Sequence, residues 1–361
     1  MGIIMFKTKF GKILYIICFI AVIAAGAFAA KTRHTLDKIA GSANNGVSLS
    51  DVDLSGIKVT TDSKIINVLI VGNDFREGVG YSETGCPDSM LIGTLDTKHG
   101  MLKLTSLMRD QIVNIPGHEG MNKLNSVYGY EDGGVKLLYK TIAENFGIKL
   151  DGYVELNFKA VREVVDAVGG IDIELTQSEA DYLNTTNYIR KKEYRNVKAG
   201  KQTLNGWQAM GYSRIRKTVY TPNGLTDDWG RTWRQRNVIN AVFNKAKKMP
   251  ISRLTKIAER MMSKYVTTDL KSDDIIGYMK DVIFMGTTKI HSCQIPVNGT
   301  IQIDQHYTNS AGTYIGDVLI PDLDQNKEAL HEFIFKYSDK DHDYEYQPKS
   351  TSSASSTETT Q

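Results

Sequence analysis

The residues of this chain that could carry chemistry are acids and bases that lie far apart in the sequence. They are Asp74, Asp88, Arg109, Lys123, Arg214, Arg216, Arg231, Arg234 and Gln235. Two carboxylates can hold a divalent cation, and several guanidinium groups match the charge of a pyrophosphate. If the fold collects these residues in one pocket, the expected chemistry is phosphoryl transfer or hydrolysis rather than chemistry on a neutral substrate.

The elements that must position the acids begin with a β-branched run over residues 65–71, IINVLIV. This run predicts a buried central strand that ends just before Asp74. Residues 90–95 and 101–107 predict two further strands, and the connection DTKHG between them is typical of a hairpin.

A hairpin folded about Lys98 places Asp88 close to Arg109 at its open end. The loop over residues 73–87 joins the first strand to the second. We therefore expect Asp74, Asp88 and Arg109 to converge at one edge of the sheet.

The segment YSRIR, residues 212–216, has strand character. In a strand, side chains alternate between faces, so Arg214 and Arg216 would share one face and could clamp adjacent phosphates. A solvated strand edge is the alternative.

A helix is predicted to begin at Asp227 and Asp228. Arg231, Arg234 and Gln235 are spaced i, i+3 and i+4, so they would share a face near its N-terminus, where the helix dipole favours anions. A surface helix with solvent-facing arginines is the alternative.

The rest of the central region alternates between helix and strand patterns, which indicates an α/β fold. Helices are predicted at 134–146 and 159–168, and strands at 153–158 and 171–175. Further helices are expected near 254–265, 273–284 and 327–335, with a strand near 290–297. One compact domain with helices covering a sheet accounts for these elements.

The ends of the chain differ from this core in composition. Residues 13–30 are uncharged and just long enough to cross a bilayer core of roughly 30 Å, although a cleaved signal peptide is the alternative. An anchor would leave residues 1–12 in the cytoplasm and the later residues outside the cell. Residues 31–63 would be an extracellular spacer, 64–346 the catalytic domain, and 347–361 a disordered Ser/Thr-rich tail.

The net charge and the cysteines exclude some function classes. A net charge of +3 is too small to indicate nonspecific nucleic-acid binding, and no nucleic-acid partner is expected. The cysteines fit no zinc or redox motif, and a bridge between Cys86 and Cys293 stays open.

Six segments together resemble the LytR-CpsA-Psr family of Gram-positive envelope phosphotransferases. They are NVLIVGNDFR, CPDSMLIGTLD, LTSLMRD, MNKLNSVYGY, GKQTLNGWQAMGYSRIRKT and DDWGRTWRQRNVI. The chain departs from the family pattern at Cys86-Pro87, where Arg-Ser is usual, and at Met108, where Pro is common.

The resemblance implies roles for individual residues. Asp74 and Asp88 would bind Mg²⁺ (or Mn²⁺). The residues implied to grip the pyrophosphate are Arg76, Arg109, Lys123, Arg214, Arg216, Arg231 and Gln235. Among them, Arg109, Arg216, Arg231 and Gln235 are the expected catalytic residues. Asp110 and Asp228 are candidates for the general base, and a structural role is the alternative for Asp110. The fold implied is a three-layer α/β/α sandwich around a largely antiparallel mixed sheet, with an apolar tunnel for a polyprenyl chain.

The reaction implied is transfer of a glycopolymer phosphate from an undecaprenyl-pyrophosphate carrier to a peptidoglycan hydroxyl, at the outer face of the cell membrane. A polyprenyl-pyrophosphate pyrophosphatase is an enzymatic alternative. A noncatalytic regulatory protein that binds the wall or its lipid precursor is the alternative outside enzymes.

Overall fold

The computed structural model describes residues 46–73, 86–216, 219–250 and 289–349, with individual residues between 253 and 287. The expected cytoplasmic segment, the anchor at 13–30 and most of the Ser/Thr-rich tail lie outside the described residues, as do Asp74 and Arg76. Among the helices that are described, none has the length and apolar character needed to cross a bilayer.

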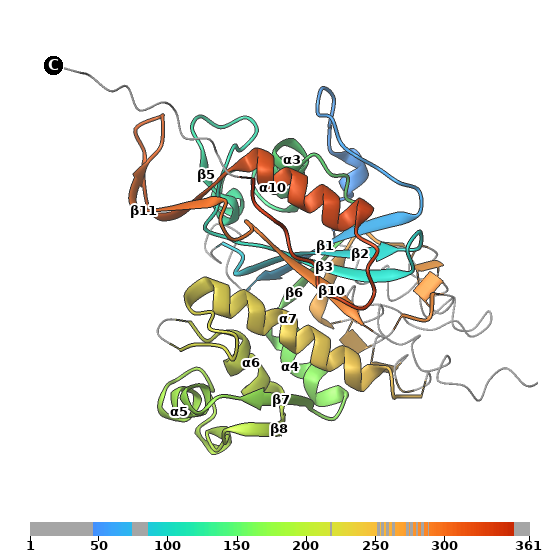
Figure 1. Cartoon of the computed structure of the whole chain (residues 1–361), viewed down its shortest axis with the longest axis vertical. Coiled ribbons are helices and arrows are strands. Elements are labelled where there is room, and N and C mark those ends of the chain that lie inside the picture. The colour runs from blue at the N-terminus through green and yellow to red at the C-terminus, as the bar shows by residue number, and fades with distance from the viewer. Residues whose placement is uncertain are drawn as a thin grey trace, which may run out of the picture.

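A six-stranded mixed sheet forms the centre of the molecule (Figure 1), in the order β10-β3-β2-β1-β6-β9. Its strands are β1 (Ile65–Asn73), β2 (Ser89–Asp96), β3 (Met101–Leu107), β6 (Gly152–Asn157), β9 (Val266–Thr268) and β10 (Ile290–Ile295). The pairs β1/β2, β2/β3 and β6/β9 are antiparallel, whereas β1/β6 and β3/β10 are parallel. The sheet is therefore mixed with an antiparallel majority, as expected.

Alternation along β1 supplies apolar side chains to both faces of the sheet. Leu69 and Val71 belong to one buried cluster, and Val68 and Ile70 belong to the other. A strand covered on both faces needs a nearly continuous apolar run, which explains the sequence IINVLIV.

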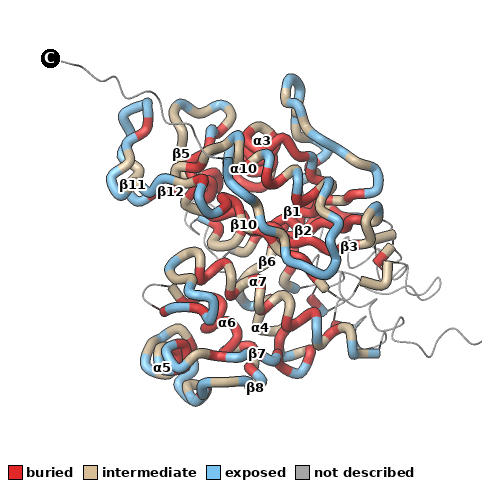
Figure 2. Tube along the Cα trace, in the orientation of Figure 1, coloured by how far each residue is buried: buried red, intermediate tan, exposed pale blue. Residues whose placement is uncertain are grey.

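Helices cover both faces (Figure 1). The helices α3 (Val135–Phe146) and α10 (Leu323–His331) lie on one side, and α4 (Phe158–Ala167), α6 (Gly206–Ser213) and α7 (Asp227–Ala246) lie on the other. Figure 2 shows the buried residues concentrated along the sheet and the helix faces turned toward it. The described part of the chain thus has three layers.

Three short two-stranded sheets of the described chain lie outside the central sheet. β4 (Ile112–Val113) pairs with β5 (Asn122–Lys123), β7 (Ile171–Leu175) with β8 (Gly200–Leu204), and β11 (Ile301–Thr308) with β12 (Tyr314–Pro321). The described residues also form the helix α5 (Gln177–Thr185), the 3₁₀ turns Leu49–Asp51, Leu124–Gly129 and Lys192–Tyr194, and a π-helical turn, Glu332–Lys336.

The folded domain begins before Lys64, within the segment expected to be a spacer. Leu49 is buried, and its backbone N–H donates to Asp269 Oδ2 at 2.9 Å. Thr60 N–H donates to the carbonyl of Gly147 at 2.8 Å. Scattered apolar residues in this polar segment pack on the core, which composition alone did not reveal.

Order also continues into the first residues of the expected tail. Lys349 N–H donates to Gln325 Oε1 at 2.9 Å, and its ammonium group pairs with Glu328. The C-terminal segment therefore rests on α10 at least as far as Lys349.

The prediction of a strand at residues 212–216 is wrong. Residues 206–213 form α6, which begins with a capping box between Asn205 and Gln208. Such reciprocal side-chain bonds satisfy two backbone N–H groups at the start of a helix. Arg214 is the C-cap residue of this helix, so Arg214 and Arg216 do not share a strand face.

Candidate active site

The β2–β3 hairpin brings Asp88 and Arg109 together. Met90 pairs with Leu107, so the residues just outside each strand lie at the same open end. Arg109 Nη1 donates to Asp88 Oδ1 at 2.6 Å. Asp88 N–H donates to Gly72 O at 3.1 Å, which ties this end of the hairpin to the end of β1. The predicted convergence of Asp88 and Arg109 is confirmed.

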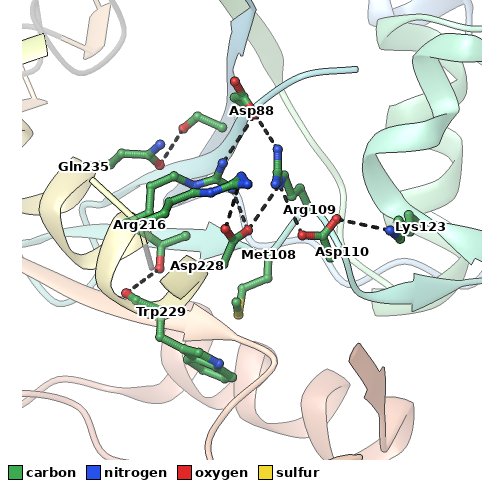
Figure 3. A network of polar contacts seen from close by, with 12 residues as sticks. Asp88, Met108, Arg109, Asp110, Lys123, Arg216, Asp228, Trp229 and Gln235 are labelled. Atoms are coloured by element: carbon green, nitrogen blue, oxygen red, sulfur yellow. Dashed lines mark hydrogen bonds and ion pairs between the residues drawn. The ribbon is translucent and has the colours of Figure 1, made fainter. Parts of the chain in front are cut away.

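The first turns of α7 complete the cluster (Figure 3). Arg231 Nη1 lies 3.3 Å from Asp88 Oδ1, and its Nη2 lies 2.7 Å from Asp228 Oδ2. Arg231 is only 4% exposed. Its Nε is a buried donor with no partner among the described residues. Such a donor is costly unless a ligand accepts from it.

Asp228 connects the arginines to one another. It accepts from Arg109 Nε at 3.2 Å, and Arg216 Nη1 lies 3.6 Å from its Oδ1. Together with Arg231, three guanidinium groups share this one carboxylate. Asp228 also stands in the first turn of α7, where the helix dipole favours negative charge.

Asp110 joins Arg109 to Lys123 at the end of β5. Arg109 Nε lies 3.2 Å from Asp110 Oδ2, and Lys123 Nζ lies 3.7 Å from Oδ1. The cluster therefore combines Arg109, Arg216, Arg231 and Lys123 with Asp88, Asp110 and Asp228. The sequence indicates Asp110 and Asp228 only as possible general bases. The structure adds that both carboxylates bridge the cationic side chains of the cluster. The signal for the Asp228 pair is its i, i+3 spacing to Arg231.

Burial and charge move the pKa values of this cluster in different directions. Burial raises the pKa of Asp110, and this effect outweighs the opposing charge of Arg109. Burial also lowers the pKa of Arg231, against the attraction of Asp228. For Arg109, burial acts downward, but Asp228, Asp110 and Asp88 together raise its pKa. A dense, partly desolvated set of charges of this kind is typical of functional sites.

Gln235 connects the charged cluster to an apolar cavity. Ser89 Oγ donates to Gln235 Oε1 at 3.1 Å, and both residues line a cavity of about 130 Å³ between the sheet, α4 and α7. The apolar lining residues include Ile70, Leu91, Leu156, Val161, Val164 and Val242. Ser89 directly follows Asp88, so the charged groups stand at the polar end of this cavity.

Arg234 does not belong to the phosphate-binding face that was predicted for it. Its side chain is completely buried, and Nε donates to Glu179 Oε1 at 2.7 Å. Nη2 donates to the carbonyl of Val219 at 3.0 Å and Nη1 to that of Ile215 at 3.4 Å. Adjacent helical residues point about 100° apart, so Arg234 is turned away from Gln235. Its role is to hold the segment that carries Arg216.

Of the two predicted metal ligands, Asp88 lies within the described residues. Oδ1 of Asp88 contacts two guanidinium groups, and the side chain is 35% exposed. In the part of the chain that is described, no group of three or more His, Cys, Asp or Glu side chains is placed to hold a metal. Mg²⁺ is commonly held by one or two carboxylates with waters and substrate phosphates, so the donor set fits a cation bound together with a phosphate ligand. The metal-binding roles of Asp74 and Asp88 and the phosphate-binding role of Arg76 stay predictions.

The two described cysteines are not bridged. Cys86 is exposed and Cys293 is buried, and both thiols are free.

The fold and sequence are similar to those of cell-envelope proteins. The model of the LytR_cpsA_psr family matches residues 27–332. The polyisoprenyl-teichoic acid–peptidoglycan teichoic acid transferase TagU of Bacillus licheniformis is 30% identical over 274 residues, covering 74% of this chain and 81% of TagU. TagU of Bacillus subtilis is 28% identical over 322 residues, covering 89% of this chain and 92% of TagU.

The fold is also similar to that of solved structures. The structure described as TagT bound to LIIa-WTA superposes with a TM-score of 0.60 and 25% identity, over 80% of this chain and 99% of TagT. The crystal structure of Bacillus subtilis TagT superposes with a TM-score of 0.55 and 25% identity, over 77% of this chain and 97% of TagT.

Proposed function

Because this chain belongs to the LytR_cpsA_psr family, we propose that it transfers a wall glycopolymer phosphate from an undecaprenyl-pyrophosphate carrier to peptidoglycan. It is a transferase, like the relatives that are named polyisoprenyl-teichoic acid–peptidoglycan teichoic acid transferases. The donor would be the polyprenyl-linked polymer, and the acceptor a hydroxyl group of peptidoglycan.

One observation carries the proposal: a cluster of cations adjoins an apolar cavity. The junction is the hydrogen bond between Ser89 and Gln235, with Asp88 and Arg231 on the charged side. An amphipathic ligand with a pyrophosphate head and a prenyl chain matches both parts. The unpartnered Nε of the buried Arg231 is a donor that a phosphate oxygen would satisfy.

In the proposed reaction, an acceptor oxygen attacks the glycan-side phosphorus in line. A new phosphorus–oxygen bond forms, and the bond from that phosphorus to the bridging oxygen breaks. Polyprenyl phosphate leaves with the electron pair. Arg109, Arg216 and Arg231 stabilise the negative charge that develops on it, because positioned guanidinium groups in a partly desolvated site stabilise such charge strongly.

Asp110 is the better candidate for the proton acceptor. Asp228 is shared by three guanidinium groups, whereas Asp110 contacts Arg109 and lies 3.7 Å from Lys123. Burial raises the pKa of Asp110, which makes it a stronger base than an ordinary carboxylate. The proton of the acceptor hydroxyl would therefore go to Asp110.

Mg²⁺ or Mn²⁺ is proposed as the cofactor, held by Asp88 and by the predicted ligand Asp74. A bound divalent cation would neutralise part of the pyrophosphate charge. Residues 13–30 are proposed to anchor the chain in the cell membrane, with the catalytic domain on the extracellular side where the carrier and the wall meet.

The decisive experiment incubates purified protein with Mg²⁺, a polyprenyl-pyrophosphate glycan and peptidoglycan. A covalent polymer–peptidoglycan conjugate is the expected product. Release of polyprenyl phosphate and glycan phosphate without conjugate would indicate a pyrophosphatase, and unaltered bound lipid would indicate a noncatalytic binding protein. Arg109→Ala should lose the conjugate, whereas Lys201→Ala, at a side chain 85% exposed on β8, should keep it.

A further inference from the structure

A second cavity lies on another flank of α7. It has a volume of about 220 Å³ and is formed by the start of α7, β10 with the residues after it, and the C-terminal segment. Its lining includes Trp229, Arg236, Gln294, Asn298, Tyr344 and Tyr346. On the helix, Arg236 points about 100° away from Gln235, which lines the apolar cavity.

Arg236 is a buried cation without an acidic partner in the described chain. The residue is 8% exposed, and Nη1 donates to Ser106 Oγ at 2.8 Å and to Gln294 Oε1 at 3.2 Å, both neutral groups. By contrast, the buried Arg231 and Arg234 each pair with a carboxylate. A buried charge is costly unless an opposite charge accompanies it.

Arg236 is charged although it is buried and has no acidic partner among the described residues. Burial lowers the pKa of Arg236 to about 10, so the side chain still carries its charge near neutral pH. Glu345 also lines the cavity, but it is exposed and makes no ion pair with Arg236. An anion that enters the cavity would therefore supply the missing partner.

This cavity shares a wall with the candidate active site. Trp229 directly follows Asp228, and Thr232 Oγ1 hydrogen-bonds to both the carbonyl of Trp229 and Gln294 Oε1. Gln294 Nε2 donates to the sulfur of Met108 at 3.3 Å, and Met108 precedes Arg109. Figure 3 shows Met108 and Trp229 on the side of Asp228 that faces away from Asp88.

The lining has the chemistry of a site for an acidic sugar. Trp229, Tyr344 and Tyr346 offer aromatic surface, and Asn298 offers an amide group. The amide of Gln294 is already bonded to Arg236, Thr232 and Met108, so it orients Arg236. A single guanidinium matches a carboxylate through paired N–H donors. The donor pyrophosphate is already assigned to the cluster around Asp88 and Arg231, which leaves this cavity for the other substrate.

We propose that the cavity around Arg236 is the acceptor subsite, and that Arg236 binds a carboxylate of a peptidoglycan sugar or of the peptide attached to it. The inference rests on the proposed function, because peptidoglycan is the acceptor there. Arg236 is a binding residue for the acceptor and takes no part in cleavage of the pyrophosphate. Two carboxylate sources exist: the lactyl group of a peptide-free muramyl residue, and the stem peptide.

Direct binding tests the subsite without turnover. Isothermal calorimetry would measure the affinity of the full-length protein for a peptide-free muramyl disaccharide, for its lactyl methyl ester, and for the free stem peptide. We expect Arg236→Gln to weaken the carboxylate-bearing probe about tenfold, as for loss of a charged hydrogen bond. The probe that loses affinity identifies the carboxylate source. Equal affinities in wild type and Arg236→Gln for every probe would overturn the proposal.

A second set of variants covers the case in which Arg236→Gln does not fold. Glu345 is exposed at the same cavity, so Glu345→Lys replaces a repelling charge with an attracting one and should tighten binding severalfold. Glu131→Lys, at another exposed acid, makes the same charge change and should leave affinity as in wild type. If Glu345→Lys and Glu131→Lys bind all three probes equally, the acceptor does not occupy this cavity.

Donor hydrolysis separates this inference from the proposed function. Arg236→Gln should need more peptidoglycan than wild type for half-maximal transfer, whereas Glu131→Lys should need the same amount as wild type. A wild-type protein that binds the disaccharide through Arg236 but never cleaves the donor would contradict the proposed function and leave the subsite supported.

Discussion

Arg109 Nη1 lies 2.6 Å from Asp88 Oδ1, across the open end of the β2–β3 hairpin. Both side chains remain partly exposed, with 18% of Arg109 and 35% of Asp88 accessible. The pair therefore lies at the ends of two paired strands and is still reachable by a ligand. A contact with these two properties is suited to binding an anion and a cation together.

The first prediction concerns this pair. Arg109→Ala should lower the rate of pyrophosphate cleavage by about 10²–10³-fold, because one aimed donor to the developing charge is lost. Arg109→Lys keeps the positive charge but loses the paired N–H donors of the guanidinium group, so its rate should be intermediate. Formation of polyprenyl phosphate from the polyprenyl-pyrophosphate glycan measures both rates. A wild-type rate in Arg109→Ala would remove Arg109 from the site.

The second prediction separates Arg234 from its neighbours on α7. Glu179→Ala leaves Arg234 buried without its carboxylate, which should cost about 3–5 kcal/mol of unfolding free energy. The double variant Glu179→Leu/Arg234→Met should cost much less, because neither charge is then buried alone. Urea denaturation measures the difference. If Glu179→Ala unfolds at the wild-type urea concentration, the pair has no structural role.

The third prediction concerns pH. Because burial raises the pKa of Asp110, its proton is lost at a higher pH than from an ordinary carboxyl group near 3.8. If Asp110 takes the proton of the attacking hydroxyl group, the transfer rate should fall as pH drops through this raised pKa. Asp110→Asn should lower the rate and abolish that acid limb. A rate profile unchanged by Asp110→Asn would assign the base elsewhere.

The same shift has a consequence for stability. A carboxyl group with a raised folded-state pKa stabilises the fold below its unfolded pKa, and this contribution is lost as pH rises through the folded value. Asp110→Asn should therefore raise the melting temperature at neutral pH relative to wild type. The gain should shrink in acid, and thermal unfolding at two pH values would measure it.

The fourth prediction concerns the apolar cavity. Val161→Phe should fill part of it and weaken long-chain donors, while a donor with a short prenyl chain keeps its affinity. Val161→Ala leaves the cavity open and is the matched control. The ratio of KM values for long-chain and short-chain donors reports the effect. Equal ratios in the phenylalanine and alanine variants would place the prenyl chain outside this cavity.

The parts of the site that depend on local folding are predictable from the sequence. The hairpin turn fixes which residues face each other, so the positions of Asp88 and Arg109 on either side of Lys98 are enough to pair them. Helical spacing likewise places Arg231 and Gln235 together. These relationships follow from the period of a strand or a helix.

The sequence predictions were wrong where a distant part of the chain determines the local structure or the contacts of a side chain. Helical spacing grouped Arg234 with Arg231, but Glu179 on α5 draws Arg234 to another flank. The strand prediction at residues 212–216 failed because the capping box that starts α6 lies upstream of that window. No sequence pattern pointed to Arg236 as a binding residue, because its cavity is lined by Tyr344 and Tyr346 from the C-terminal segment.

Three consecutive residues of α7 point in three directions. Arg234 makes a buried ion pair, Gln235 borders the apolar cavity and Arg236 lines the second cavity. Inserting or deleting one residue upstream within the helix would rotate all three by about 100° relative to the start of α7. Each side chain would then face its neighbour's surroundings. A substitution in this helix therefore affects one of these three surroundings, whereas a change in the number of residues before Arg234 affects all three at once.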